Sequence, residues 1–427
     1  MSAPVTGRAA PTPGPDPEQP AQSAADLDPR LLVDEAGIRG YGIALVRRVR
    51  GGDLGSLPVI IGLVVIWLFF YSKQHTFLSA ENLSNLTLQM VAVGTISVGI
   101  VMVLLLGEVD LSAGSVSGVT SAILATQIAH SHRNQAVAIV IALIAGALIG
   151  TLHGFFRGRL GVPSLVVTLA GLLAWQGAQL RVLGTTGTVT VSTGLVHALT
   201  FDFLSHSFGE ILAAAAVVAY AAAQQYERSA RGRAGLRPRP LVEIVARTVV
   251  LAAVLAITVI VLDRYKGIPV ALVVFLTLVV LFDLLIRKTT YGRHVLAVGG
   301  NVEAARRAGI PIAFIRISVF AISGMMAAAG GVLFCSYLQS VDQSTGGSQT
   351  LLYAIAAAVI GGTSLFGGRG SAYSALLGIL VIESIANGMA LLSYPSSTQF
   401  MVTGSVLLAA VTLDAVSRRG QPGGSSR

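Results

Sequence analysis

The sequence predicts an all-α, polytopic membrane protein, and three observations lead to this fold class. Hydrophobic residues make up 53% of the 427 residues and charged residues only 11%, whereas a soluble domain has roughly 25% charged residues. The apolar residues form long continuous runs without the alternation of barrel strands, so helices are expected. Short clusters of arginine separate the runs, as in loops at a membrane surface.

Twelve apolar runs predict about twelve transmembrane helices, because a spanning helix needs about 20 residues. The runs occupy residues 57–72, 83–106, 112–130, 135–156, 163–183, 208–224, 241–262, 268–286, 313–337, 350–366, 372–392 and 397–416.

These runs define a transmembrane domain, residues 51–416, between two polar tails. Residues 1–50 form a cytoplasmic tail that is expected to be largely disordered, because its first half is rich in Pro, Asp and Gln. Residues 417–427 form a second cytoplasmic tail. Segments 184–207 and 338–349, rich in Thr, Ser, Gly and Gln, are expected to be exposed outside the cytoplasm.

The positions of Lys and Arg predict the topology. Cytoplasmic loops carry an excess of these residues, so we expect an even number of spans with both termini in the cytoplasm. The net charge of +9 lies in these loops, which argues against a nucleic-acid partner. The outer segments hold Lys73, Arg133, Arg264 and Lys266, with Arg181 near a helix end. The inner segments hold Arg47, Arg48, Arg50, Arg157, Arg159, Arg228, Arg231, Arg233, Arg237, Arg239, Arg287, Lys288, Arg293, Arg306, Arg307, Arg369, Arg418 and Arg419.

Several enzyme signatures are missing from the sequence. It contains no Gly-Lys dipeptide, so it cannot contain the phosphate loop G-x-x-x-x-G-K-[ST]. Its seven histidines are scattered without metal-ligand spacing, and no G-x-S-x-G element occurs. We therefore expect no metal, no cofactor and no catalytic residues, and a transport function is favoured over an enzyme.

Two carboxylates, Glu108 and Asp110, stand between two apolar runs. A carboxylate at the centre of a span costs about 2.5–3.5 kcal/mol, so both are expected at a helix break. Asp110 is suited to cap the next helix, an interpretation weighted at least equally with substrate contact. Glu108 needs a partner, a proton or water, and is the better candidate for a polar cavity.

Glycines recur at helical spacing in two runs. Gly146, Gly150, Gly154 and Gly158 are four residues apart, as are Gly114 and Gly118. Small residues at this spacing let helix backbones approach closely, so close helix packing is the expected role.

Three segments, in order, resemble the monosaccharide permeases of ABC importers, the ribose, xylose and galactose group. They are GEVDLSAGSV (107–116), YGRHVLAVGGNVEAARRAGI (291–310) and AIAAAVIGGTSLFGGRGS (354–371). Two further spans and an Arg-rich loop at 208–262 look like the xylose-type permeases. Glu108 replaces the usual second glycine of the first segment.

The resemblance implies a permease subunit of a bacterial cell-membrane importer, working as a homodimer by alternating access. Its implied partners are an ABC ATPase subunit that hydrolyses ATP, an extracytoplasmic sugar-binding protein, membrane lipid and a sugar, with xylose the first choice.

Residues 291–312 are then implied to be a cytoplasmic coupling segment. Asn301 can cap a short helix and Gly309 can end it, although the residues alone favour a simple structured loop equally. The implied contact has the alanines in a groove of the ATPase and the charges at its rim. The coupling residues are Gly299, Gly300, Asn301, Glu303, Ala304, Ala305, Arg306 and Arg307.

Sugar transit calls for neutral hydrogen-bonding groups and aromatic faces, and each candidate for the pathway has packing as an alternative role. The candidates are Gln89, Glu108, Asp110, Ser112, Trp175, Gln176, Glu383 and Asn387. The alternatives are an ion-coupled secondary transporter with Glu108, Asp110 and Glu383 as proton or Na⁺ sites, a permease for another sugar or polyol, and a non-transporting scaffold.

Overall fold

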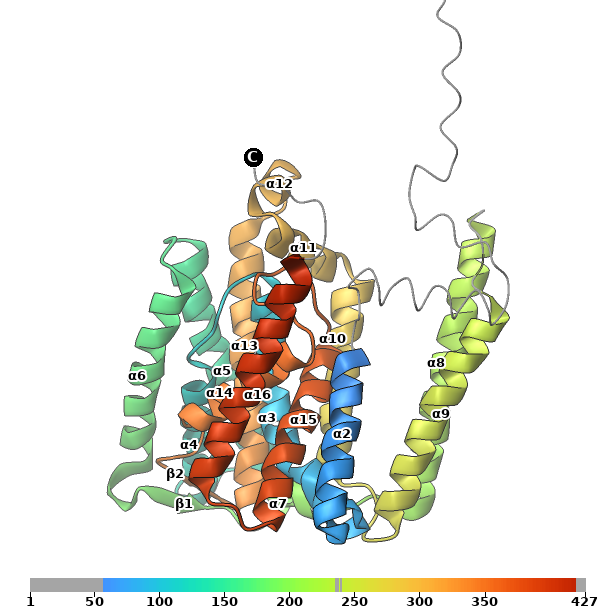
Figure 1. The fold of residues 1–427 in the computed structure, drawn as a ribbon. Coiled ribbons are helices and arrows are strands. Elements are labelled where there is room, and N and C mark those ends of the chain that lie inside the picture. The colour runs from blue at the N-terminus through green and yellow to red at the C-terminus, as the bar shows by residue number, and fades with distance from the viewer. Residues whose placement is uncertain (1–56, 235–237, 239, 420–427) are drawn as a thin grey trace, which may run out of the picture. The chain divides into compact units, whose positions relative to one another are not determined.

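The computed structural model describes residues 57–234, 238 and 240–419 (Figure 1). The predicted N-terminal tail and most of the C-terminal tail lie outside the described residues, as do Arg237 and Arg239. The helices are α2 (Leu57–Lys73), α3 (Ala80–Leu105), α4 (Ala113–Ala129), α5 (Gln135–Gly158), α6 (Ser164–Leu183), α7 (Gly194–Phe201), α8 (His206–Arg233), α9 (Leu241–Asp263), α10 (Val270–Lys288), α11 (Thr290–Gly300), α12 (Val302–Arg307), α13 (Ile312–Leu338), α14 (Ser348–Ile360), α15 (Ala372–Leu391) and α16 (Ser396–Arg419). Two short 3-10 helices (His75–Leu78, Gly184–Thr186) and two strands, β1 (Thr188–Thr190) and β2 (Ser340–Asp342), complete the described fold.

Each of the twelve predicted runs contains a helix of the described chain, and the number of twelve spans stays a prediction. By length and apolar composition, eight helices of the described chain can cross a membrane: α3, α5, α6, α8, α9, α10, α13 and α15. The run at 350–366 gives only the 13-residue α14, because Gly361 and Gly362 follow it and Gly362 adopts a φ of +104°. Thirteen residues rise about 20 Å, less than the roughly 30 Å of a bilayer core.

Helix α3 forms the centre of the fold. In its most apolar 18-residue stretch, 94% of the residues are buried. It packs against α13, α15, α14 and α10, and a helix that is hydrophobic on every side is expected to be enclosed in this way.

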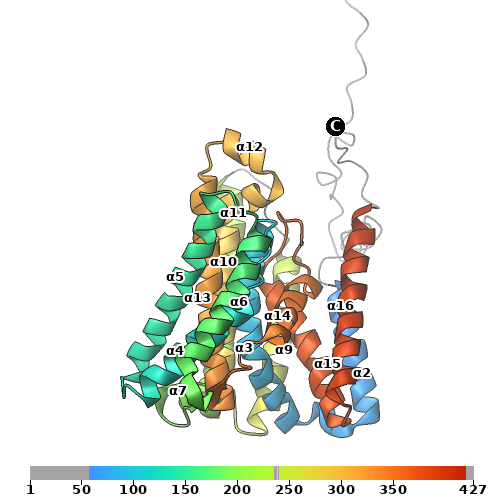
Figure 2. The ribbon, with the colours of Figure 1, turned by 90° about the vertical axis from the view of Figure 1, so that its left-hand side faces the viewer.

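The glycine pattern of α5 has the predicted packing role. Helix α5 lies along α13 (Figure 2). A methyl group at Gly150 would overlap the backbone carbonyl of Phe320, and one at Gly154 would lie 2.6 Å from the Cα of Ile317. Glycine is therefore what allows the two backbones to approach. Gly114 and Gly118 differ, because they lie against the loop that follows β2.

The segment 208–262 forms the hairpin of α8 and α9, of which few residues are buried (Figure 1). Only 6% and 11% of the residues in their apolar stretches are buried. At one end Lys288 of α10 pairs with Glu227 of α8, and at the other His206 Nδ1 lies 3.1 Å from Asp263 Oδ1.

The segments 184–207 and 338–349 are not simply exposed, which corrects the sequence prediction. Strand β1 pairs antiparallel with β2, so the fold is not purely helical. Helix α7 buries Val196 and Thr200, and the Thr200 hydroxyl lies 2.8 Å from the Ser336 hydroxyl of α13. Short polar segments can therefore be structured by pairing with each other and with the helix ends.

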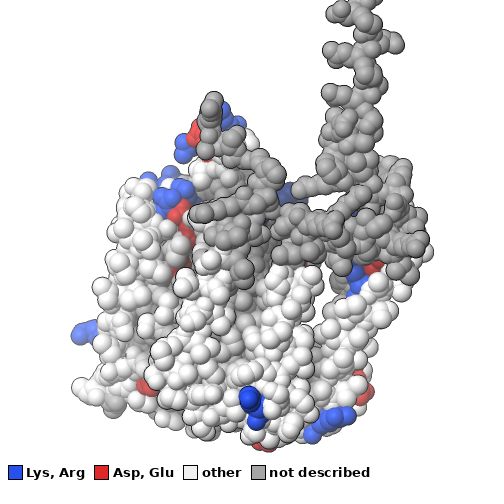
Figure 3. All heavy atoms as spheres, viewed as in Figure 1, with Lys and Arg blue, Asp and Glu red and all other residues white. Residues whose placement is uncertain are grey.

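On the face shown in Figure 3, most charged side chains lie towards the two ends of the helices, and the visible surface between them is largely uncharged. Helices α11 and α12 lie at one end, and β1, β2 and α7 at the other (Figure 1). This is the surface expected of a bundle in lipid. The side on which each terminus lies stays a prediction.

Candidate functional site

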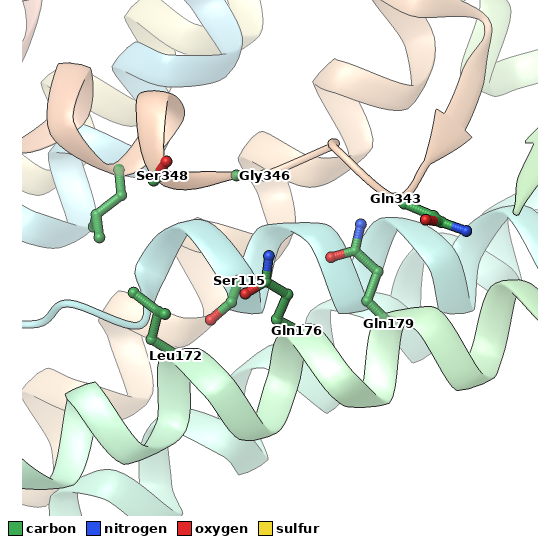
Figure 4. A pocket seen from close by; sticks show the side chains of 9 residues that line it. Ser115, Leu172, Gln176, Gln179, Gln343, Gly346 and Ser348 are labelled. Atoms are coloured by element: carbon green, nitrogen blue, oxygen red, sulfur yellow. The ribbon is translucent and has the colours of Figure 1, made fainter.

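A pocket with both polar and apolar lining residues lies between α4, α6, the loop after β2 and the start of α14. Its volume is about 190 Å³, below the roughly 300–1,000 Å³ of pockets for drug-sized ligands. Figure 4 shows Gln176 and Gln179 on α6, with Ser115 of α4 beside them. The lining is electrically neutral and consists of Ser115, Leu172, Gln176, Gln179, Gln343, Gly346, Gly347, Ser348 and Leu351.

Gln179 connects α6 to the loop that follows β2, which we call the pocket loop. Its side chain is buried, and its amide nitrogen donates hydrogen bonds of 2.9 Å to the carbonyl oxygens of Asp342 and Thr345. The glycine at Gly118 makes room for this amide, because a methyl group there would overlap the Gln179 side chain. The loop is thus held where Gln343 and Gly346 close the pocket.

Asp342 organises the same loop. Burial alone would raise the pKa of Asp342, but hydrogen bonds from the hydroxyls and backbone N–H groups of Ser344 and Thr345 outweigh it and hold the pKa below its usual range. The carboxylate therefore stays ionised at neutral pH and keeps accepting these bonds, which are 2.8–3.0 Å long.

A chain of hydrogen bonds links four helices beside the pocket; we call it the Asp110 chain. Asp110 Oδ2 accepts from the Ser323 hydroxyl of α13 at 2.9 Å, and Asp110 Oδ1 accepts from the Ser112 hydroxyl at 2.6 Å. Ser112 Oγ lies 3.2 Å from Nδ1 of His153 on α5. The indole Nε1 of Trp175 on α6 donates to His153 Nε2 at 2.9 Å. Three predicted pathway residues, Asp110, Ser112 and Trp175, thus meet through a histidine.

Asp110 is not the N-cap that the sequence suggested. Helix α4 begins at Ala113, so the N-cap is Ser112. Asp110 lies two residues earlier and accepts the Ser112 N–H at 2.9 Å, which stabilises the turn leading into the helix.

Glu108 has ionic partners rather than an open cavity. Its Oε1 accepts from Arg157 Nε at 2.6 Å and lies 3.4 Å from Arg316 Nε. The side chains are 7%, 22% and 15% exposed, so the cluster is largely buried. It joins the end of α5 to the first turns of α13.

Two predicted pathway residues, Gln89 and Asn387, lie in a separate network between α3 and α15. Asn82 donates to Asn387 at 2.8 Å, and Asn387 donates to Gln89 at 3.3 Å. Glu383, one turn before Asn387, is buried, and no hydrogen bond or ion pair joins it to another described residue. The predicted pathway residues therefore lie in several separate parts of the fold. Among them, only Gln176 lines the pocket.

The coupling segment contains the predicted capped helix. Asn301 is the N-cap of α12, and its side chain accepts the Ala304 N–H at 2.9 Å. Glu303 pairs with Arg306 at 3.1 Å and with Arg307 at 3.5 Å. Ala304 is exposed, but Ala305 is only 3% exposed within its own chain. Ala305 is therefore unsuited to a partner's groove, which corrects that part of the expectation.

Glycines bring the three recognised segments together in space. The Gly368 N–H donates to the carbonyl of Leu105 at 2.9 Å. A side chain at Gly299 would overlap the same carbonyl, and one at Gly367 would lie 2.7 Å from Gly107 N and from Gly299 O. Gly300, in contrast, has open space beside it. The end of α3, the end of α11 and the loop after α14 thus form one junction.

Several pocket and network residues were missed from the sequence: Ser115, Gln179, Gln343, Ser348, His153, Ser323 and Arg316. Two signals could have found some of them. Gln179 lies one helical turn after Gln176 on the same apolar run, and His153 is a histidine in the interior of an apolar run. Within the described residues, no three His, Cys, Asp or Glu side chains converge where a metal ion could bind.

Residues 82–411 match the family described as the branched-chain amino acid transport system permease component. The chain is 35% identical to the xylose transport system permease protein XylH of Escherichia coli strain K12, over 86% of this chain and 93% of that protein. It is 34% identical to XylH of Haemophilus influenzae, over 87% of this chain and 99% of that protein. It is 29% identical to the ribose import permease protein RbsC of Bacillus subtilis, over 85% of this chain and 94% of that protein. No solved structure matches.

The family match covers the helices that line the pocket, the Asp110 chain and the coupling segment. The XylH relatives are aligned over nearly their whole length. The chain therefore belongs to this family of transport-system permease components.

Proposed function

We propose that this chain is the membrane permease subunit of a bacterial ABC importer that carries a neutral monosaccharide, xylose first, across the inner membrane. A separate ATPase subunit hydrolyses the ATP, an extracytoplasmic binding protein delivers the sugar, and two copies of the chain work as a homodimer. The permeases named above for xylose and ribose support this assignment, whereas the family description names amino acids.

The neutral lining of the pocket supports a sugar rather than an amino acid as the substrate. An amino acid carries an ammonium and a carboxylate, and buried charges need paired partners. The pocket offers glutamine amides, serine hydroxyls and backbone groups. These groups both donate and accept hydrogen bonds, which suits the hydroxyls of a small sugar.

An ion-coupled carrier is the second candidate, and Glu383 is the observation in its favour. A buried carboxylate without a described partner is a functional candidate by default. Glu108 and Asp110 support it less, because Glu108 is paired with arginine and Asp110 accepts three hydrogen bonds.

The exposed face of α12 supports a coupling role. Glu303, Ala304, Arg306 and Arg307 are exposed there. Helix α13 starts shortly afterwards and carries Ser323 of the Asp110 chain. A displacement of α12 by the ATPase would thus reach the pocket through one continuous helix, as alternating access requires.

Replacing Ala304 by Glu is expected to lower both ATPase co-purification and xylose uptake at least about tenfold, the equivalent of about 1.4 kcal/mol of docking. The new side chain enlarges an exposed contact surface and adds a charge that the partner does not match. Membrane expression should stay normal, because Ala304 is exposed. Uptake and pull-down of the ATPase subunit check this.

Ala136→Glu is the matched control, since Ala136 is also exposed in the first turn of a helix, at the opposite end of the fold. It should leave uptake and ATPase binding unchanged. Full uptake by the Ala304→Glu variant, with the ATPase still bound, would place the coupling surface elsewhere, and the Arg-rich segment 225–240 would be examined next.

A further inference from the structure

We propose that His153 is a positioning residue, which as a neutral imidazole fixes α6 against α4 and so sets the width of the sugar pocket. The proposal rests on the proposed function for its link to sugar. The geometry that it invokes is independent of that function.

His153 lies between the two helices that form the pocket walls. Its Nδ1 faces Ser112, the N-cap of α4, and its Nε2 accepts from Trp175 of α6. Helix α6 also comes close to the ring at Gly171, where a methyl group would lie 2.6 Å from Nε2. The imidazole is therefore enclosed, and only 4% of the residue is exposed.

The hydrogen bonds determine which nitrogen carries the proton. An indole N–H can only donate, so Nε2 must be the unprotonated acceptor. A neutral ring then carries its proton on Nδ1 and donates to Ser112 Oγ. The Ser112 hydroxyl in turn donates to Asp110 Oδ1. The hydrogen bonds from Trp175 through His153 and Ser112 to Asp110 thus have consistent donors and acceptors, which fixes the ring orientation.

The bridge connects both walls at the level of the pocket. Ser115 lies one turn after Ser112 on α4, and Gln176 directly follows Trp175 on α6. Besides the bridge, α6 packs mainly on α4 and is tied to the pocket loop by the two hydrogen bonds of Gln179, and only 17% of the residues in its apolar stretch are buried. Losing the bridge should therefore let α6 shift and separate the groups that contact a sugar.

The test uses His153→Leu, which removes both hydrogen bonds, and His153→Gln, whose side-chain oxygen can still accept from Trp175. Both are prepared in the full chain, assembled with its ATPase and binding protein. The chain has two tryptophans, Trp67 and Trp175, so nitrogen-15 labelled tryptophan gives two indole signals, and Trp67→Phe assigns them.

We expect the Trp175 indole proton to be shifted downfield in the unmodified protein and in His153→Gln, and to lose that shift in His153→Leu. Xylose uptake should fall at least about tenfold in His153→Leu and stay within about threefold in His153→Gln. His130→Leu, at an exposed histidine at the end of α4, should change neither signal nor uptake.

Normal uptake by His153→Leu, or a Trp175 signal without the downfield shift in the unmodified protein, would overturn the proposal. If His153→Leu does not fold, Trp175→Phe decides, because it keeps an aromatic, although smaller, side chain and removes the N–H donor: a tenfold loss of uptake supports the bridge and normal uptake overturns it. If the unmodified protein shows the shifted signal but carries no xylose, the proposed function fails while the bridge stands.

Discussion

Replacing Glu108 by Ala is expected to lower the free energy of unfolding by about 3 kcal/mol. The change leaves the guanidinium groups of Arg157 and Arg316 close together without their shared carboxylate. Breaking a buried ion pair typically costs about 3–5 kcal/mol, and the lower end applies because both arginines keep some solvent contact. Thermal unfolding of the purified protein in detergent measures the loss.

The double variant Glu108→Ala, Arg157→Ala should recover part of this loss, because it removes one of the two uncompensated charges. Glu210→Ala, at an exposed carboxylate of α8, is the control and should leave the unfolding temperature unchanged. An unfolding temperature for Glu108→Ala equal to that of the unmodified protein would show that the cluster contributes nothing to stability. Glu108 would then return as a candidate for the pathway.

Replacing Gly150 by Ala is expected to destabilise the packing of α5 on α13 by about 3 kcal/mol. Overpacking usually costs about 1–3 kcal/mol. The upper end applies because the new methyl group would meet the backbone of Phe320 rather than a movable side chain. The two helices must separate, so both the yield of folded protein and its unfolding temperature should fall.

Gly177→Ala on α6 is the matched control, because nothing lies within 4 Å of a methyl group at that position. There the change should be neutral or stabilising by up to about 1 kcal/mol, since alanine favours a helix over glycine. A loss of stability in Gly150→Ala together with no loss in Gly177→Ala would show that packing, and not helix propensity, causes the effect at Gly150. Equal effects at the two positions would contradict the close approach of α5 and α13.

The helices and the capped coupling helix could be predicted because they depend on local sequence. Apolar runs locate each long helix, and Asn301 followed by Glu303 locates α12. The four-residue glycine spacing of α5 similarly indicated close packing. The end of α14 was predicted too late, because Leu365 and Phe366 were counted in the apolar run although Gly361, Gly362, Thr363 and Ser364 separate them from the helix and Gly362 adopts a positive φ.

The pocket and its supporting hydrogen bonds could be predicted only in part. Gln176, Ser112, Asp110 and Trp175 stood out as polar residues near apolar runs. Their partners depend on which helices become neighbours, and nothing local in the sequence brings His153 to Trp175. Glu108 was predicted to face a polar cavity because no partner for its charge stands near it in the sequence. Its partner Arg157 lies 49 residues away.

ATP-dependent uptake of labelled xylose into vesicles, by this chain assembled with its ATPase and binding protein, tests the proposed function most directly. We expect uptake that requires ATP, persists when the proton and sodium gradients are collapsed, and is suppressed by excess unlabelled xylose but not by leucine. Competition by leucine would assign an amino-acid substrate. Xylose uptake that continues without ATP and stops when the gradients are collapsed would contradict the importer assignment and favour an ion-coupled carrier.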